Sequence, residues 1–143
     1  MSNKEVRALE RQIFEVMNEG KAAIVAKIDE VCSADILAHT ATGNDLRGVE
    51  AFKQYMVGFY DAFPDLHITI EDILVDGDKA ATRYTYTGTN RGAFMGVPPT
   101  NRRITGWAIE IDRFSDGRLV ELWGRLDTLG LMQQLGLIPA PKR

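Results

Sequence analysis

Arg103–Asp127 reads RITGWAIEIDRFSDGRLVELWGRLD, and this stretch decides the fold. It holds two runs rich in Ile, Val, Leu and Trp whose period of two is typical of β-strands. Between them, Ser115-Asp116-Gly117 supplies residues that tolerate positive φ, so the runs predict an antiparallel hairpin. Alternation along the second run predicts that a carboxylate, an indole and a guanidinium share one face, formed by Glu121, Trp123, Arg125 and Asp127.

The same reasoning, extended outward, predicts four main strands and three N-terminal helices. The expected strands are His67–Val75, Lys79–Thr89, Arg103–Phe114 and Leu119–Leu126. The expected helices are Glu5–Asn18, Lys21–Leu37 and Gly48–Phe63, with a short helical tail at Thr128–Leu137. Helices followed by antiparallel strands predict an α+β fold in which the helices cover one face of a curved sheet and leave a pocket at its open end.

Length and composition predict one globular domain that spans residues 1–143, because a chain of this size can bury its own core. The formal charge of −3 and the scattered Lys and Arg residues argue against nucleic-acid binding. No apolar run approaches membrane-spanning length, and the N-terminus lacks the apolar core of a signal peptide. We therefore expect a cytoplasmic protein that does not bind membranes.

Cysteine and histidine are scarce, which limits the chemistry that the side chains can support. Cys32 is the only cysteine and lies in an apolar helical series, so we expect a buried, unreactive thiol. His39 and His67 are the only histidines, and neither has a carboxylate at ligand spacing. The sequence therefore predicts no transition-metal site built from side chains.

Four segments resemble the SnoaL-like polyketide cyclases, or ester cyclases, of the nuclear transport factor 2-like superfamily. They are FPDL (Phe63–Leu66), GDKAATRYTYTGT (Gly77–Thr89), GAFMGVPP (Gly92–Pro99) and DGRLVELWGRLD (Asp116–Asp127). The resemblance runs from about Val31 to Leu137. It implies a cone-shaped barrel, in which a strongly bent antiparallel sheet wraps around the N-terminal helices and encloses a deep apolar pocket.

The resemblance also implies cofactor-free acid/base chemistry on a small-molecule carbonyl compound, such as aldol cyclisation, isomerisation or a related lyase reaction. Asp127 matches the family's acid/base aspartate, which follows the tryptophan of the last strand. A pocket walled by Trp123 and aliphatic groups would raise the pKa of that carboxyl, as a base for carbon acids requires. A structural ion pair of Asp127 with an arginine is the alternative reading.

Several other residues are candidates for the site, each with a structural alternative. His39 could carry a second proton or cap helix carbonyls. Arg83 could grip a substrate oxygen, or pair across strands with Glu110 or Asp112. The aromatic candidates could bind substrate or simply fill the core; they are Trp107, Trp123, Tyr86 and Phe94. The connection Gly92–Pro99 could form a rim, a lid or a fixed link.

Two further hypotheses concern function and assembly. Many family members have a histidine between the glutamate and tryptophan of the last strand, where this chain has Leu122, so a non-catalytic small-molecule binder of the same fold is the alternative. The strand Arg103–Phe114 carries apolar residues on both faces. One face should cover the pocket, and the other should be covered by a partner. This predicts a homodimer or higher homo-oligomer.

Overall fold

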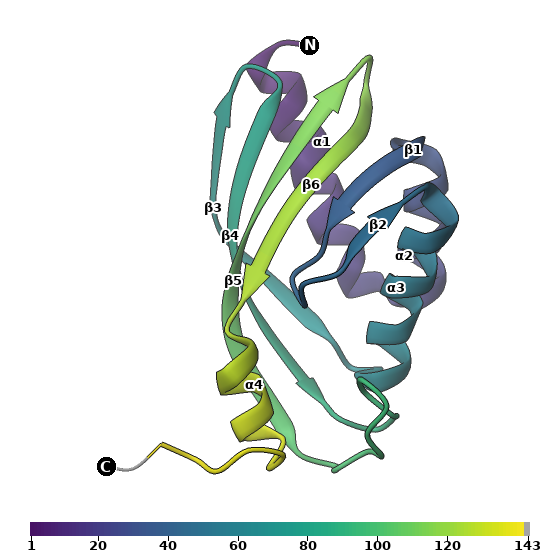
Figure 1. Ribbon diagram of the computed structural model, residues 1–143. Coiled ribbons are helices and arrows are strands. Elements are labelled where there is room, and N and C mark those ends of the chain that lie inside the picture. The colour runs from purple at the N-terminus through teal and green to yellow at the C-terminus, as the bar shows by residue number, and fades with distance from the viewer. Residues whose placement is uncertain (142–143) are drawn as a thin grey trace.

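Within residues 1–141, which the computed structural model describes, six strands form one mixed sheet in the order β2-β1-β6-β5-β4-β3 (Figure 1). Their bounds are β1 (Cys32–His39), β2 (Asp45–Arg47), β3 (His67–Asp76), β4 (Lys79–Thr89), β5 (Arg103–Ser115) and β6 (Arg118–Leu126). Neighbouring strands pair antiparallel, except that β1 and β6 run parallel. The α+β fold class is confirmed, but the sheet is mixed rather than antiparallel throughout.

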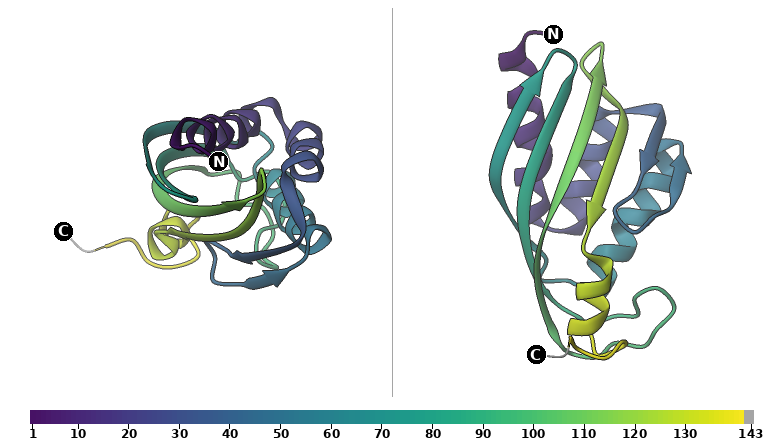
Figure 2. Two further views of the ribbon diagram at one scale, coloured as in Figure 1. Left: turned by 90° about the horizontal axis from the view of Figure 1, so that it is seen from above. Right: turned by 60° about the vertical axis from the view of Figure 1, so that its left-hand side comes forward.

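The three N-terminal helices lie along one side of the sheet (Figures 1 and 2). They are α1 (Asn3–Val16), which the short 3-10 turn η1 (Met17–Glu19) follows, α2 (Lys21–Val31) and α3 (Val49–Ala62). Ser2 begins α1 with a capping box, because its hydroxyl accepts a hydrogen bond from the Glu5 backbone and the Glu5 side chain reaches back. α1 packs on β3 and β4, whereas α2 and α3 pack on each other beside β1.

Both predicted hairpins are present, and their turns explain the strand boundaries. β3 and β4 are joined through Gly77, and β5 and β6 through Asp116 and Gly117; all three residues have positive φ. Asp116 and Gly117 have φ values of 51° and 78°, a conformation that most side chains resist. The two turns therefore set where β3 and β5 end and where β4 and β6 begin.

The region from Lys21 to Leu37 was predicted wrongly as one helix. α2 ends at Val31, and Cys32 already has the extended backbone of β1. β1 pairs with β6, some eighty residues later in the chain, through register partners such as Ala38 and Leu122. A strand held by such distant pairing carries little local signal, and the same holds for the short β2.

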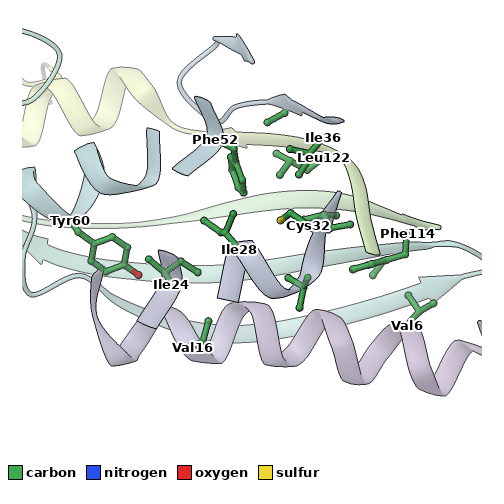
Figure 3. Close-up of a cluster of buried hydrophobic side chains, with 14 residues drawn as sticks. Val6, Val16, Ile24, Ile28, Cys32, Ile36, Phe52, Tyr60, Phe114 and Leu122 are labelled. Carbon is green, nitrogen blue, oxygen red and sulfur yellow. The ribbon is translucent and has the colours of Figure 1, made fainter. Parts of the chain in front are cut away.

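The core lies between the helices and the inward face of the sheet (Figure 3). One cluster joins α1, α2 and α3 to β1 and β6; Val6, Ile24, Ile28, Ile36, Phe52 and Leu122 are among its members. A second cluster, near the short helix α4 (Thr128–Gln134), includes Phe14, Phe63, Tyr86, Phe94 and Leu131. Among the described residues, no helix has the length and apolarity needed to cross a membrane.

Candidate active site

An apolar cavity of about 100 Å³ lies between the helices and the inward face of the sheet. Its aromatic wall comes from α1, α3 and β4; Phe14, Phe52, Tyr55, Phe59, Tyr84 and Tyr86 all line it. Cavities that hold drug-sized ligands usually measure about 300 Å³ or more. The cavity as it stands therefore fits a small ring, and a larger substrate requires side chains of the wall to move.

Two carboxyl groups on β5 interrupt this apolar wall. Glu110 and Asp112 point inward on the same phase as the buried Ala108. The apolar residues of the same strand point outward instead: Ile109 and Ile111 are 44% and 39% exposed. Shifting β5 by one residue would bury the isoleucines and expose both acids, so its register places charge-bearing groups inside at the expense of apolar burial.

Glu110 is placed to meet a ligand. It lines the cavity and is only partly buried, whereas Asp112 is fully buried. Its Oε1 atom lies 3.5 Å from the point where a Cβ atom at Gly124 of β6 would stand, which is an ordinary van der Waals distance. Burial, reinforced by the nearby Asp112, raises the pKa of Glu110 well above its ordinary value. A carboxyl group whose pKa is raised by burial is a candidate for proton transfer.

Sequence reasoning missed both β5 acids, although a signal was present. Glu110 and Asp112 stand two residues apart and therefore share a face with the small residues Gly106 and Ala108. Alternation alone does not say which face is inside. The large apolar side chains of Trp107, Ile109 and Ile111 suggested that their face, rather than that of the two acids, is buried. The inward orientation is visible only once β5 pairs with its neighbours.

Asp127 lies outside the cavity, which contradicts the prediction that it faces one pocket together with Trp123 and Arg83. It is exposed at the end of β6, where its Oδ1 atom accepts a hydrogen bond of 2.9 Å from the Gly130 backbone N–H and caps α4. This contact gives the carboxylate a structural task. Its predicted acid/base role stays a prediction, to which the geometry adds no support.

His39 and Trp123 lie on the outer face of the sheet, away from the cavity. The His39 ring nitrogens Nδ1 and Nε2 lie 2.8 Å from Asp45 and 2.9 Å from Glu121, respectively. Hydrogen bonding to Glu121, and then to Asp45, raises the pKa of this histidine. The Trp123 ring stacks on it at 5.5 Å, so both residues belong to a surface network.

Arg83 and Trp107 also point outward from β4 and β5. The Arg83 guanidinium forms hydrogen bonds of 2.6 and 3.0 Å to Asp72 on β3. Arg83 therefore forms a cross-strand ion pair, as the structural alternative predicted, but with a different partner. Glu110 and Asp112, the partners suggested by sequence, lie on the opposite face. Trp107 is 57% exposed. Neither residue contributes to the wall of the cavity.

Of the predicted aromatic residues, Tyr86 lines the cavity and Phe94 supports it from behind. The Phe94 ring packs at 5.6 Å from Phe59 and 5.2 Å from Phe63, which are both wall residues. The connection that carries Phe94 is tied down by the buried Asn90. The Asn90 amide bonds the Gly92 carbonyl at 2.8 Å and accepts from the Thr100 backbone at 2.8 Å. These bonds favour a fixed rim over a moving lid.

Comparison with known proteins agrees with this architecture. The sequence model of the SnoaL-like polyketide cyclases matches residues 7–135 of the 143. The chain belongs to this family. Among solved structures, AclR from Streptomyces galilaeus, proposed to be a hydroxylase, superimposes on this SnoaL-like chain with a TM-score of 0.83 and 31% identity, covering 99% of this chain and 87% of AclR.

Two curated relatives are cyclases. The aklanonic acid methyl ester cyclase DauD of Streptomyces sp. (strain C5) is 30% identical to this SnoaL-like chain over 131 residues, which cover 90% of this chain and 80% of DauD. The nogalonic acid methyl ester cyclase of Streptomyces nogalater is 27% identical over 112 residues, or 76% of this chain and 83% of the relative. The family therefore includes methyl ester cyclases as relatives of this chain.

Proposed function

We propose that this SnoaL-like chain is a cofactor-free enzyme of the polyketide cyclase type that acts on a carbonyl compound, with Glu110 as the proton-transferring residue. The observation that carries the proposal is the reversed pattern of β5, which turns Glu110 and Asp112 toward an apolar cavity while Ile109 and Ile111 face solvent. Acidic groups without a function are rarely kept in such a place, because burying them costs several kcal/mol each.

The chemistry follows from one carboxyl group and an apolar wall. The Glu110 carboxylate takes a proton from the carbon beside a carbonyl group, which leaves an enolate and a protonated Glu110. The enolate carbon then forms a bond to a second carbonyl carbon of the same molecule. The resulting alkoxide takes the proton back from Glu110, so the residue returns to its starting state and no other reactant is consumed.

A hydroxyl group on the wall can stabilise the enolate oxygen. Tyr84 lines the cavity, and burial raises the pKa of its phenol well above the ordinary value, so it stays a hydrogen-bond donor. Thr40 also lines the cavity, but its hydroxyl already donates a hydrogen bond of 3.0 Å to the Asn44 carbonyl, which leaves the donor role to Tyr84. Donors in a site without bulk water stabilise developing negative charge more than they would in solution.

A direct test measures ring closure of aklanonic acid methyl ester, the compound named for the curated relatives, by chromatography. Proton exchange at the acidic carbon of a simple 1,3-diketone in D2O, followed by NMR, extends the test to smaller substrates. We expect Glu110→Gln to lower either rate by about 100-fold or more. Asp127→Asn is the matched control and should retain the rate; an unchanged rate in Glu110→Gln contradicts the proposal.

A non-catalytic binder is the second candidate, and Leu122 favours it. This residue stands where many relatives have a histidine, and it is buried in the core and lines the cavity. A binder would show no turnover of either probe, but small molecules would co-purify with the native protein and appear in its mass spectrum.

We also propose that two copies pair through the outer face of the sheet. Four apolar side chains of β5 and β6 are exposed there, and we call them the outer patch: Trp107, Ile109, Ile111 and Trp123. An apolar patch across a sheet face commonly marks an interface.

A further inference from the structure

Glu10 interrupts the buried stripe of α1. It stands between Val6 and Phe14 at helical spacing, and all three side chains are buried. An acidic residue in such a stripe replaces apolar packing with a group that resists leaving water. Its position is therefore unexplained by the packing of α1 alone.

The carboxyl groups of Glu10 on α1 and Asp112 on β5 lie within hydrogen-bonding reach of each other. Both side chains are fully buried, at 0% exposure. Within the described part of the chain, none of their four carboxyl oxygens has an ordinary hydrogen-bond partner. Two carboxyl groups in contact can satisfy each other only when a proton lies between them, because two carboxylates would repel. A protonated pair therefore satisfies groups that would otherwise stay buried without a partner.

The pair lies directly beside Glu110. Asp112 and Glu110 project from the same face of β5, two residues apart. Thr82, whose hydroxyl is also buried, is the register partner of Glu110 on β4 and faces Glu10. Charge on Asp112 would therefore act on Glu110 at close range through a medium that screens poorly.

We propose that Glu10 and Asp112 are positioning residues that stay protonated and hydrogen-bond to each other, which keeps Asp112 uncharged, so that Glu110 is the member of the cluster that takes the negative charge and acts as the base. This role rests on the proposed function, because it requires Glu110 to transfer the proton. The existence of the protonated pair does not depend on it.

The surroundings support a protonated pair. Burial raises the pKa of Glu10 to about 8, and burial followed by the charge of Glu10 raises that of Asp112 well above its ordinary value. The other titratable groups around the cavity are Cys32, Tyr55, Tyr84, Tyr86 and Lys27. Burial raises the pKa of Cys32 to about 12, and also raises those of Tyr55, Tyr84 and Tyr86, so these groups stay neutral. Lys27 pairs with Glu30 at 3.3 Å and carries the remaining charge of the lining.

A bound cation is the competing explanation for three neighbouring acids. Among the residues that the structure describes, no set of three His, Cys, Asp or Glu side chains has an arrangement that could hold a metal ion. Protonation of Glu10 and Asp112 therefore explains how the two carboxyl groups can be buried together without a metal ion.

Carboxyl-carbon NMR of the ¹³C-labelled protein, recorded as pH rises, tests the pair without any substrate. Correlation spectra that link each side-chain carboxyl carbon to its own backbone assign the three resonances in the wild type, and their loss in Asp112→Asn, Glu10→Gln and Glu110→Gln checks the assignment. In the wild type, we expect Glu10 and Asp112 to keep the shift of a protonated acid after exposed acids have ionised near pH ~4. Asp112 ionising together with the exposed acids would overturn the pair, and this reading needs no variant to fold.

Glu10→Gln tests the coupling to Glu110. The new amide N–H can donate to Asp112 and stabilise its carboxylate, so Asp112 should ionise at lower pH, and its charge should then raise the apparent pKa of Glu110 by about one unit or more. Glu15→Gln, at an exposed position of the same helix, is the matched control and should move neither titration. Unmoved titrations of Asp112 and Glu110 in Glu10→Gln would overturn the positioning role.

The two proposals can fail separately. If Glu110→Gln abolishes turnover while the titrations show no protonated pair, the positioning role is wrong and the function stands. If the pair is present but wild type and Glu110→Gln are equally inactive, the proposed function fails, and with it the role that we assign to the pair.

Discussion

Single residues in this chain are placed against the usual rule that apolar groups lie inside and charged groups outside. Glu10, Glu110 and Asp112 face the interior, while Trp107 and Ile109 face outward. Proteins that keep buried acids do so at a cost in stability that depends on pH. That dependence makes the three acids visible in a measurement of unfolding, even before any activity is known.

Wild-type stability should fall as pH rises from 5 to 8. The folded protein keeps a proton on Glu10 up to pH about 8, whereas the unfolded chain releases it near pH 4.5. The unfolded state therefore binds fewer protons in this window, and the free energy of unfolding decreases with pH. Glu10 alone contributes on the order of 4 kcal/mol to this fall, since each unit of pKa shift corresponds to about 1.4 kcal/mol.

Urea denaturation at pH 5 and pH 8 checks this prediction. The pKa of His39 is also raised, so its contribution to the free energy of unfolding also falls as pH rises. The comparison of variants is therefore more decisive than the wild type alone. Glu10→Gln should show a clearly smaller fall than wild type, and Glu15→Gln should show the full one. Equal pH dependence in Glu10→Gln and wild type would mean that Glu10 is not held protonated.

At the scale of elements, local pattern predicted the four C-terminal strands and α3 to within about two residues. These elements combine clear periodicity with turn or stop signals, such as Gly117 and Pro64. β1 was missed because its residues, CSADILAH, include helix formers, and because its strand conformation depends on pairing with the distant β6. Asp127, Trp123 and Arg83 were wrongly expected to face the cavity for a related reason: alternation groups residues by face, but tertiary packing decides which face is buried.

Asp127 provides a test at this scale, because its capping role belongs to α4. Asp127→Ala removes the acceptor for the Gly130 N–H and should lower the free energy of unfolding by about 1 kcal/mol in urea denaturation. Asp127→Asn retains a good capping side chain and should change stability little. An acid/base role would instead make both variants inactive, so turnover falling in Asp127→Asn would restore the original sequence prediction.

At the scale of the whole molecule, the reversed pattern of β5 has a second consequence. Turning its acids inward exposes the outer patch, in which Trp107 and Trp123 are 57% and 37% exposed. A second copy of the chain can cover this patch with the same patch, since a twofold interface is self-complementary. The charged groups at its border, including Arg83 with Asp72 and the Glu121–Arg113 pair, can form the polar rim that stable interfaces show.

Light scattering at low micromolar concentration should therefore give about twice the monomer mass of 15.9 kDa. Ile109→Glu places a charge at the centre of the outer patch and should shift the protein to the monomer mass, because an unpaired charge buried in an interface costs several kcal/mol. Met95→Glu is the matched control, since Met95 is also exposed but lies in the connection between β4 and β5. A wild-type protein that scatters as a monomer would mean that the outer patch stays exposed to water. The free-energy cost of turning Glu110 and Asp112 inward would then be offset within a single chain rather than by assembly.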